Sequence, residues 1–170
     1  MQQSIPTILS LAELFDNLTK TQLELVASIC EPATFDAGTV LIQENESSDE
    51  LYVIGRGTVE ILMNPAFVSA TQEEVASVVV AELRHGQVFG EIALVDQGIR
   101  SATARVSQDN TYILRIPRKR LMLLCDTYPD LGYKLMKNLA ADMAMKMRNT
   151  DLTIRYYQLK LADSEGADED

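Results

Sequence analysis

The chain has 170 residues, of which 46% are hydrophobic and 24% charged, and these values fit one globular domain with a core of its own. Its formal net charge of -10 and pI near 4.6 argue against a broad nucleic-acid surface, because neutralising phosphates requires clustered Lys and Arg. The sequence has no apolar run of about eighteen residues and no basic N-terminal region followed by an apolar stretch. We therefore expect a cytoplasmic protein without a membrane span, a signal peptide or direct DNA binding.

Residues 1–32 are expected to form short helices, the first part of a domain that spans residues 1–160. Ser10-x-x-Glu13 and Thr19-x-x-Gln22 each match a capping box. In this motif, the side chain of the first residue accepts from the backbone N–H of the fourth, and the side chain of the fourth accepts from the backbone N–H of the first. Each box therefore predicts the start of a short helix.

Residues 33–117 are expected to form a β-roll, because short β-rich runs alternate with glycine-containing turns and no long helix intervenes. The predicted strands are 39–42, 51–54, 58–62, 78–83, 102–106 and 111–116. Residues 63–77 are interpreted as a polar surface insertion of unknown purpose with room for a helical turn. The predicted fold class is α+β: an antiparallel β jelly roll or sandwich with short N-terminal helices and a long C-terminal helix.

Residues 118–160 are expected to be helical, and apolar or small residues recur there at alternating spacings of four and three. This heptad seam comprises Met136, Ala140, Met143, Met147, Thr150, Ile154, Tyr157 and Leu161. We interpret it as the interface of a parallel homodimer formed through residues 136–161, since Leu135 and Leu139 offer a second face for packing on the domain. A helix packed on its own domain is the alternative. The acidic residues 161–170 are expected to form a disordered tail.

Few residues are available for a metal site or a disulfide. Cys30 and Cys125 are the only cysteines, and we interpret them as buried free thiols, with a disulfide as the alternative. His85 is the only histidine, so a metal-dependent cupin enzyme is not expected.

The most informative segment is Phe89-Gly90-Glu91-Ile92-Ala93-Leu94, which is followed by Arg100-Ser101-Ala102-Thr103. A carboxylate such as Glu91 can accept a hydrogen bond from a ribose hydroxyl, and a guanidinium such as that of Arg100 can engage phosphodiester oxygens. Gly90 lets the backbone approach a ligand without a side-chain clash. A structural Glu91–Arg100 salt bridge is the alternative interpretation.

This segment resembles the phosphate-binding cassette of cyclic nucleotide-binding domains, as found in catabolite activator-type regulators and in regulatory subunits of cyclic AMP-dependent protein kinases. The family pattern is roughly F-G-E-[LI]-A-L, a short loop and R-[SA]-[AT]. The segments Phe35-Asp36-Ala37-Gly38 and 49–57 resemble earlier strands and turns of the family, so the resemblance covers about Leu14 to the mid-150s.

The resemblance implies a cyclic nucleotide as ligand and assigns residues to its parts. Glu91 would bind the ribose 2'-hydroxyl, and Arg100, Ser101 and the amides of a short helix starting at Ile92 and Ala93 would bind the phosphate. The ligand-binding residues expected are Phe89, Gly90, Glu91, Ile92, Ala93, Arg100, Ser101, Ala102, Val80 and Met143. Ala102 favours cAMP, because relatives that prefer cGMP often carry threonine there, and cGMP remains open.

The sequence departs from the family at several positions. Asn45 stands in a turn where relatives often have glycine, but asparagine tolerates left-handed backbone geometry. On the long helix, Asp142 replaces a frequent arginine, and Lys146 and Met147 replace a pair that reads adenine in some relatives. The chain also ends in acidic residues where activator-type regulators continue into a helix-turn-helix domain.

Two functions of different class follow. The first is a stand-alone cyclic nucleotide sensor that passes its signal through the C-terminal dimer helix to a separate protein. The second is an interaction or scaffold module with a degenerate or atypical ligand site. We expect no enzymatic activity, no cofactor and no metal, because no metal cluster or base-activated nucleophile is evident.

Overall fold

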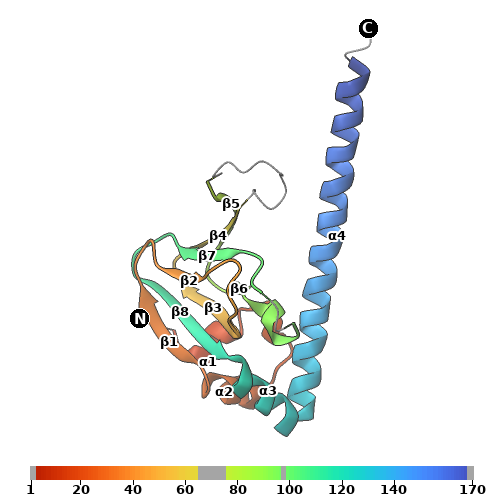
Figure 1. The fold of residues 1–170 in the computed structure, drawn as a ribbon. Coiled ribbons are helices and arrows are strands. Elements are labelled where there is room, and N and C mark those ends of the chain that lie inside the picture. The colour runs from red at the N-terminus through yellow and green to blue at the C-terminus, as the bar shows by residue number, and fades with distance from the viewer. Residues whose placement is uncertain (1–2, 65–75, 97–98, 168–170) are drawn as a thin grey trace.

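The computed structural model describes residues 3–64, 76–96 and 99–167, with side chains as far as Lys160. Its centre is an antiparallel sandwich of two four-stranded sheets with strand orders β1-β8-β3-β6 and β2-β7-β4-β5 (Figure 1). The strands are β1 (Glu31–Phe35), β2 (Val40–Ile42), β3 (Glu50–Arg56), β4 (Val59–Met63), β5 (Val78–Leu83), β6 (Val88–Phe89), β7 (Thr103–Val106) and β8 (Thr111–Pro117). The predicted α+β fold class is confirmed. The expected insertion at 63–77 lies largely outside the described residues.

The central strand β3 is buried on both faces, which explains its unbroken apolar run. Tyr52 and Ile54 point into the space between the two sheets, where they join Phe89 and Ile113 in one core cluster. Leu51 and Val53 alternate with them and face the helices. The N-terminal and C-terminal helices therefore cover one face of the β1-β8-β3-β6 sheet.

The helices are α1 (Ile5–Leu9), α2 (Lys20–Ala27), α3 (Arg118–Thr127) and α4 (Pro129–Ala167), with short 3-10 turns η1 (Glu13–Phe15) and η3 (Glu91–Leu94). The predicted capping box at Thr19 and Gln22 is confirmed, with both bonds present at the start of α2. The one at Ser10 is wrong: Ser10 ends α1, and its hydroxyl donates to the Thr7 carbonyl instead. The first helix begins earlier than expected, because Ser4 caps it.

Helix α4 has two parts with different surroundings. Leu131, Leu135 and Leu139, at a spacing of four, are buried against the domain, so the second face predicted for the helix is present. Two residues of the predicted seam, Met136 and Met143, also pack partly against this core. Farther along, α4 continues well beyond the sheets (Figure 1) and its apolar side chains are exposed.

The helix also runs farther than expected. Its backbone is helical through Ala167, where the sequence predicts a disordered tail from residue 161. Helical hydrogen bonds can continue through acidic residues because they join backbone groups alone. Residues 168–170 lie outside the described part of the chain.

Candidate ligand-binding site

The cassette begins where β6 ends at Phe89 and the chain turns through Gly90 into η3. Gly90 has φ +77° and ψ 11°, the left-handed region that favours glycine. A Cβ at this position would lie 2.8 Å from the carbonyl oxygen of Glu50 and 3.1 Å from Arg100 Nη1. The turn therefore requires glycine both for its backbone angles and for its close contacts.

Arg100 is held in place by two backbone carbonyls and the hydroxyl of Ser48. Its side chain is buried, with 8% of the residue exposed. Nε donates to Ser48 Oγ at 2.8 Å, Nη1 to the Gly90 carbonyl at 3.1 Å and Nη2 to the Glu50 carbonyl at 2.8 Å. These bonds fix the plane of the guanidinium, and burial lowers its pKa while nearby acidic groups oppose that effect.

The loop that carries Asn45 also positions Arg100. The Asn45 amide donates to the Arg100 carbonyl at 2.9 Å, and the Arg100 amide donates to the Glu46 carbonyl at 3.0 Å. Asn45 itself has φ +69°, so asparagine adopts the left-handed turn that the sequence predicts it can tolerate. The departure from glycine leaves the turn intact.

Glu91 is paired with the long helix. Lys146 Nζ of α4 donates to Glu91 Oε1 at 2.5 Å and lies 2.8 Å from Asp142 Oδ2. The Glu91 side chain is 10% exposed and that of Lys146 is 53% exposed. Burial lowers the pKa of Lys146, but the Asp142 and Glu91 carboxylates outweigh burial and raise it above its ordinary value. In the described part of the chain, Glu91 forms its ion pair with Lys146, so the alternative of a Glu91–Arg100 salt bridge is wrong.

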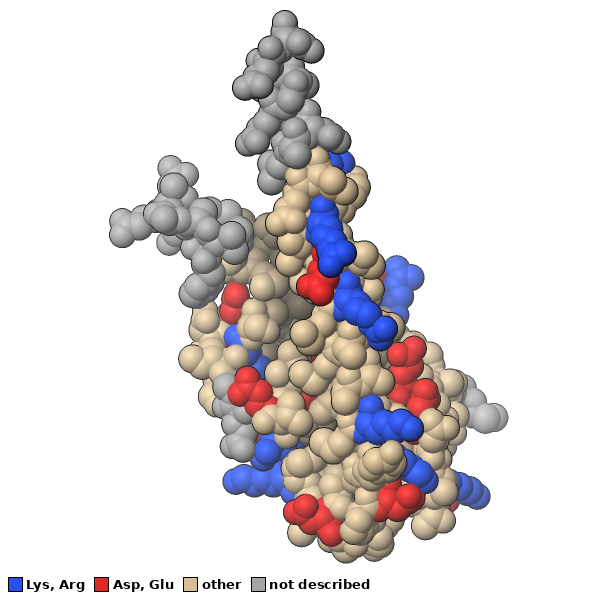
Figure 2. Space-filling model, turned by 90° about the vertical axis from the view of Figure 1, so that its right-hand side faces the viewer, with Lys and Arg blue, Asp and Glu red and all other residues tan. Residues whose placement is uncertain are grey.

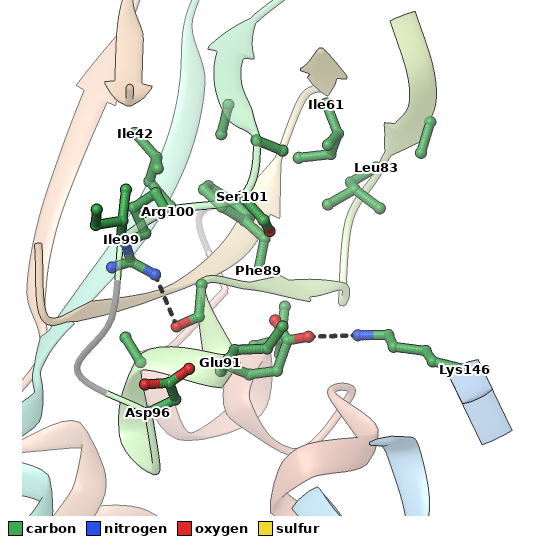
Figure 3. Close-up of a pocket in the computed structure, with 17 residues that line it drawn as sticks. Ile42, Ile61, Leu83, Phe89, Glu91, Asp96, Ile99, Arg100, Ser101 and Lys146 are labelled. Atoms are coloured by element: carbon green, nitrogen blue, oxygen red, sulfur yellow. Dashed lines mark hydrogen bonds and ion pairs between the residues drawn. The ribbon is translucent and has the colours of Figure 1, made fainter. Parts of the chain in front are cut away.

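A cavity of about 300 Å³ lies between the cassette, the inner face of the β2-β7-β4-β5 sheet and α4. Its polar side chains include Glu91, Arg100, Ser101 and Lys146. Figure 3 shows Ile61 and Leu83 on the opposite side of the cavity from Ile99 and Asp96. The cavity thus combines one polar region with an apolar wall, as a ligand with a charged group and a flat ring requires.

Most of the residues expected to bind ligand meet at this cavity. Those that line it are Phe89, Gly90, Glu91, Ile92, Ala93, Arg100, Ser101 and Ala102. Val80 does not line it, and its neighbour Ala81 does, because successive side chains of β5 point to opposite faces. Met143 does not line it either, since it packs partly against the core of the domain.

The sequence analysis expected Val80 and Ala81 to supply an apolar wall, and it missed the larger side chains that form most of it. Ile42, Ile61 and Leu83 line the cavity from three different strands, and their contribution depends on how those strands are paired. The apolar residues of 58–62 and 78–83 were the available signal, although they do not say which cavity each face of a strand lines. Lys146 was expected at the base end of the site as a departure from the family, and its contact with Glu91 was not predicted.

Other kinds of site find little support among the described residues. They contain no group of three or more His, Cys, Asp or Glu side chains that could hold a metal ion, and no helix among them is long and apolar enough to cross a bilayer. Cys30 and Cys125 are free thiols, and burial raises the pKa of Cys30 to about 12. On the face that carries α4, basic and acidic side chains are interspersed (Figure 2).

Comparison with known proteins agrees with this geometry. A family model described as the cyclic nucleotide-binding domain matches residues 32–128. The Cyclic AMP receptor protein of Thermus thermophilus is 28% identical over 141 residues, covering 83% of this chain and 60% of that protein. Cyclic GMP-binding protein C of Dictyostelium discoideum is 30% identical over 128 residues, covering 74% of this chain and 5% of that protein. The chain thus spans less than two thirds of the length of these relatives.

A solved structure gives the same result for the fold. The crystal structure of the Thermus thermophilus Catabolite Activator Protein matches with a TM-score of 0.72 and 26% identity, covering 86% of this chain and 63% of that one. Together with the cassette, these matches show that the chain belongs to the cyclic nucleotide-binding domain family. Its relatives are cyclic nucleotide-binding regulatory or sensor domains.

Proposed function

We propose that the cavity binds a cyclic nucleotide, with cAMP preferred over cGMP, and that the chain acts as a regulatory sensor. The observation that carries this proposal is the presence of a fixed guanidinium and a carboxylate in one cavity of about 300 Å³. Arg100 has five N–H groups, and three of its nitrogens are committed to Ser48, Gly90 and Glu50 in the described structure. The remaining N–H groups can donate to the cyclic phosphate.

The ribose and the base would occupy the rest of the cavity. Glu91 supplies the acceptor for the ribose 2'-hydroxyl, and the apolar wall of Ile61 and Leu83 offers a surface for a purine ring. Ala102 lines the cavity where relatives that prefer cGMP often carry threonine, which supports cAMP. One relative is named as a cyclic GMP-binding protein, so both nucleotides belong in the test.

The signal would leave the site through α4 and reach a separate protein. Lys146 places this helix in the cavity wall, and the residues beyond it expose part of the predicted seam, including Met147, Ile154 and Tyr157. A second copy of the chain would cover these side chains in a parallel homodimer. Occupancy of the site would then alter the helix that joins the two copies.

Calorimetric titration with cAMP and cGMP tests the proposal, using the parent protein, Arg100→Ala and Arg105→Ala. Arg105 is the matched control, because it pairs with Glu60 and neither side chain lines the cavity. We expect saturable binding to the parent and to Arg105→Ala, and a loss of roughly a hundredfold or more for Arg100→Ala. Arg100→Ala also removes three hydrogen bonds, so we expect about 2 kcal/mol less stability, to be measured by urea unfolding.

The interaction-module alternative is favoured by a separate observation, the exposed apolar side chains of α4. Leu152 and Leu159 are 64% and 67% exposed and lie among other exposed apolar side chains of α4. Contiguous exposed apolar surface of this kind is typical of a site that binds another protein. If neither nucleotide binds the parent while the chain still self-associates, this alternative replaces the sensor. Binding that survives unchanged in Arg100→Ala would instead mean that the assigned site is wrong.

A further inference from the structure

The ion pair between the cassette and α4 gives the nucleotide site a contact that its sequence motif does not contain. Lys146 Nζ bonds Glu91 Oε1, and Asp142, one helical turn before it, holds the same ammonium group. Glu91 is almost fully buried, so a counter-charge is needed to keep its carboxylate in the cavity wall without a large desolvation cost. The pair joins residues that are far apart in the sequence (Figure 3).

We propose that Lys146 is a positioning residue of this site: it holds the Glu91 carboxylate by one oxygen and leaves the other for the ribose hydroxyl, so that α4 and the ligand share Glu91. This inference rests on the proposed function. A carboxylate has room for several hydrogen-bond donors, so a ribose hydroxyl can bind without displacing the lysine. In the described structure, Lys146 is the one side chain bonded to Glu91.

Sharing one carboxylate couples the helix to the ligand. If the Lys146 contact strengthens ribose binding to Glu91, then a bound ribose must strengthen the Lys146–Glu91 contact by the same free energy. This follows because coupling between two binding events is reciprocal. Nucleotide binding would therefore tighten the contact of α4 with the cassette at Lys146. The contact lies near the start of the exposed part of α4, where Met145 is 46% and Met147 69% exposed.

The first test compares Lys146→Met, Lys146→Arg and Lys137→Met by titration with cAMP and with 2'-deoxy-cAMP. Lys137 is exposed on the same helix and forms no ion pair within the described residues, so it is the matched control. We expect Lys146→Met to weaken cAMP binding roughly fivefold, Lys146→Arg to restore most of it, and Lys137→Met to leave it unchanged. The 2'-deoxy analogue should bind the parent and Lys146→Met equally, because it has no hydroxyl for Glu91.

Three results would overturn the proposal. Unchanged cAMP binding in Lys146→Met would show that Lys146 does not position Glu91 for the ligand. Tighter binding would show that the lysine competes with the ligand for Glu91. An equal loss for 2'-deoxy-cAMP would show that Lys146 acts on the base or the phosphate, and not through Glu91.

A second test, hydrogen exchange, has a ligand-free part that separates this inference from the proposed function. Hydrogen exchange of the α4 amides around Lys146 should be faster in Lys146→Met than in the parent and unchanged in Lys137→Met. Added cAMP should slow exchange there in the parent and have less effect in Lys146→Met. If the parent binds neither nucleotide, the proposed function and the ribose step both fail, while ligand-free exchange still decides whether Lys146 ties α4 to the cassette. Equal exchange rates in all three proteins would show that Lys146 does not hold α4 against the cassette.

Discussion

At the scale of single residues, the site depends on a glycine whose role is geometric and an arginine whose role is both structural and chemical. Gly90 brings the cassette backbone to within hydrogen-bond reach of the guanidinium, and its own carbonyl accepts from Arg100 Nη1. Arg100 in turn joins Ser48 and the first residue of β3, Glu50, to the cassette. The residues that would bind the phosphate are therefore also those that hold the loops around it together.

Gly90→Ala should reduce stability by about 2–4 kcal/mol, because alanine is strained at φ +77° and its Cβ would crowd the Glu50 carbonyl. Gly38→Ala is the matched control: Gly38 has φ +90°, but an added Cβ meets nothing within 4 Å. We expect it to cost only about 1–2 kcal/mol, for the backbone alone. Urea unfolding of both variants measures the difference, and equal losses would show that the close contact at Gly90 is unimportant.

At the scale of elements, α4 changes character along its length. Its first turns bury Leu131, Leu135 and Leu139 against the domain, while the part beyond Lys146 is exposed. This division fits a helix whose first part packs on its own domain and whose later part is available to a partner. The seam predicted from Met136 onward overlaps the first part, so we expect its effective portion to begin near Met147.

Ile154→Glu should weaken the proposed homodimer at least roughly tenfold, because it would place a charge in the apolar seam. Leu152→Glu is the control, since Leu152 is similarly exposed but lies outside the seam positions. Sedimentation equilibrium of the two variants and the parent measures the dissociation constants. A parent that remains monomeric at high concentration, or equal weakening by both substitutions, would contradict the seam.

The elements show what the sequence could predict and what it could not. The continuous apolar run Leu51–Ile54 and a complete capping box at Thr19 depend on local chemistry, and both are found. The strands β1 and β6 were missed, since Pro32 breaks the pattern of one and the other has only two residues. Ser10 matched a capping motif but ends a helix, because a motif of two residues does not fix which turn it belongs to.

The site was predictable to the extent that it follows one continuous motif. The cassette from Phe89 to Ala102 lies in one stretch of chain, so its residues could be named together. The apolar wall and Lys146 come from strands and a helix that are distant in sequence, and only the packed structure brings them to the cavity. Val80 differs from its neighbour Ala81 by one position in β5, and one position reverses the side of a strand.

At the scale of the whole molecule, the cassette is connected to the C-terminal helices at two points. Lys146 of α4 contacts Glu91, the first residue of η3. Arg118 of α3 donates through Nε to the carbonyl of Leu94, the last residue of η3, at 3.1 Å. A shift of η3 on ligand binding would therefore act on both helices. Under the proposed function, these two contacts would connect an occupied cavity with the exposed part of α4.

The most direct test of the central claim, that this cavity is a cyclic nucleotide site, is an NMR titration of the ¹⁵N-labelled protein with cAMP. We predict that amide shifts will concentrate in residues 88–94 and 99–104 and in α4 near Lys146. Shifts confined to surfaces away from the cavity, or none at saturating nucleotide, would contradict the assignment of the site.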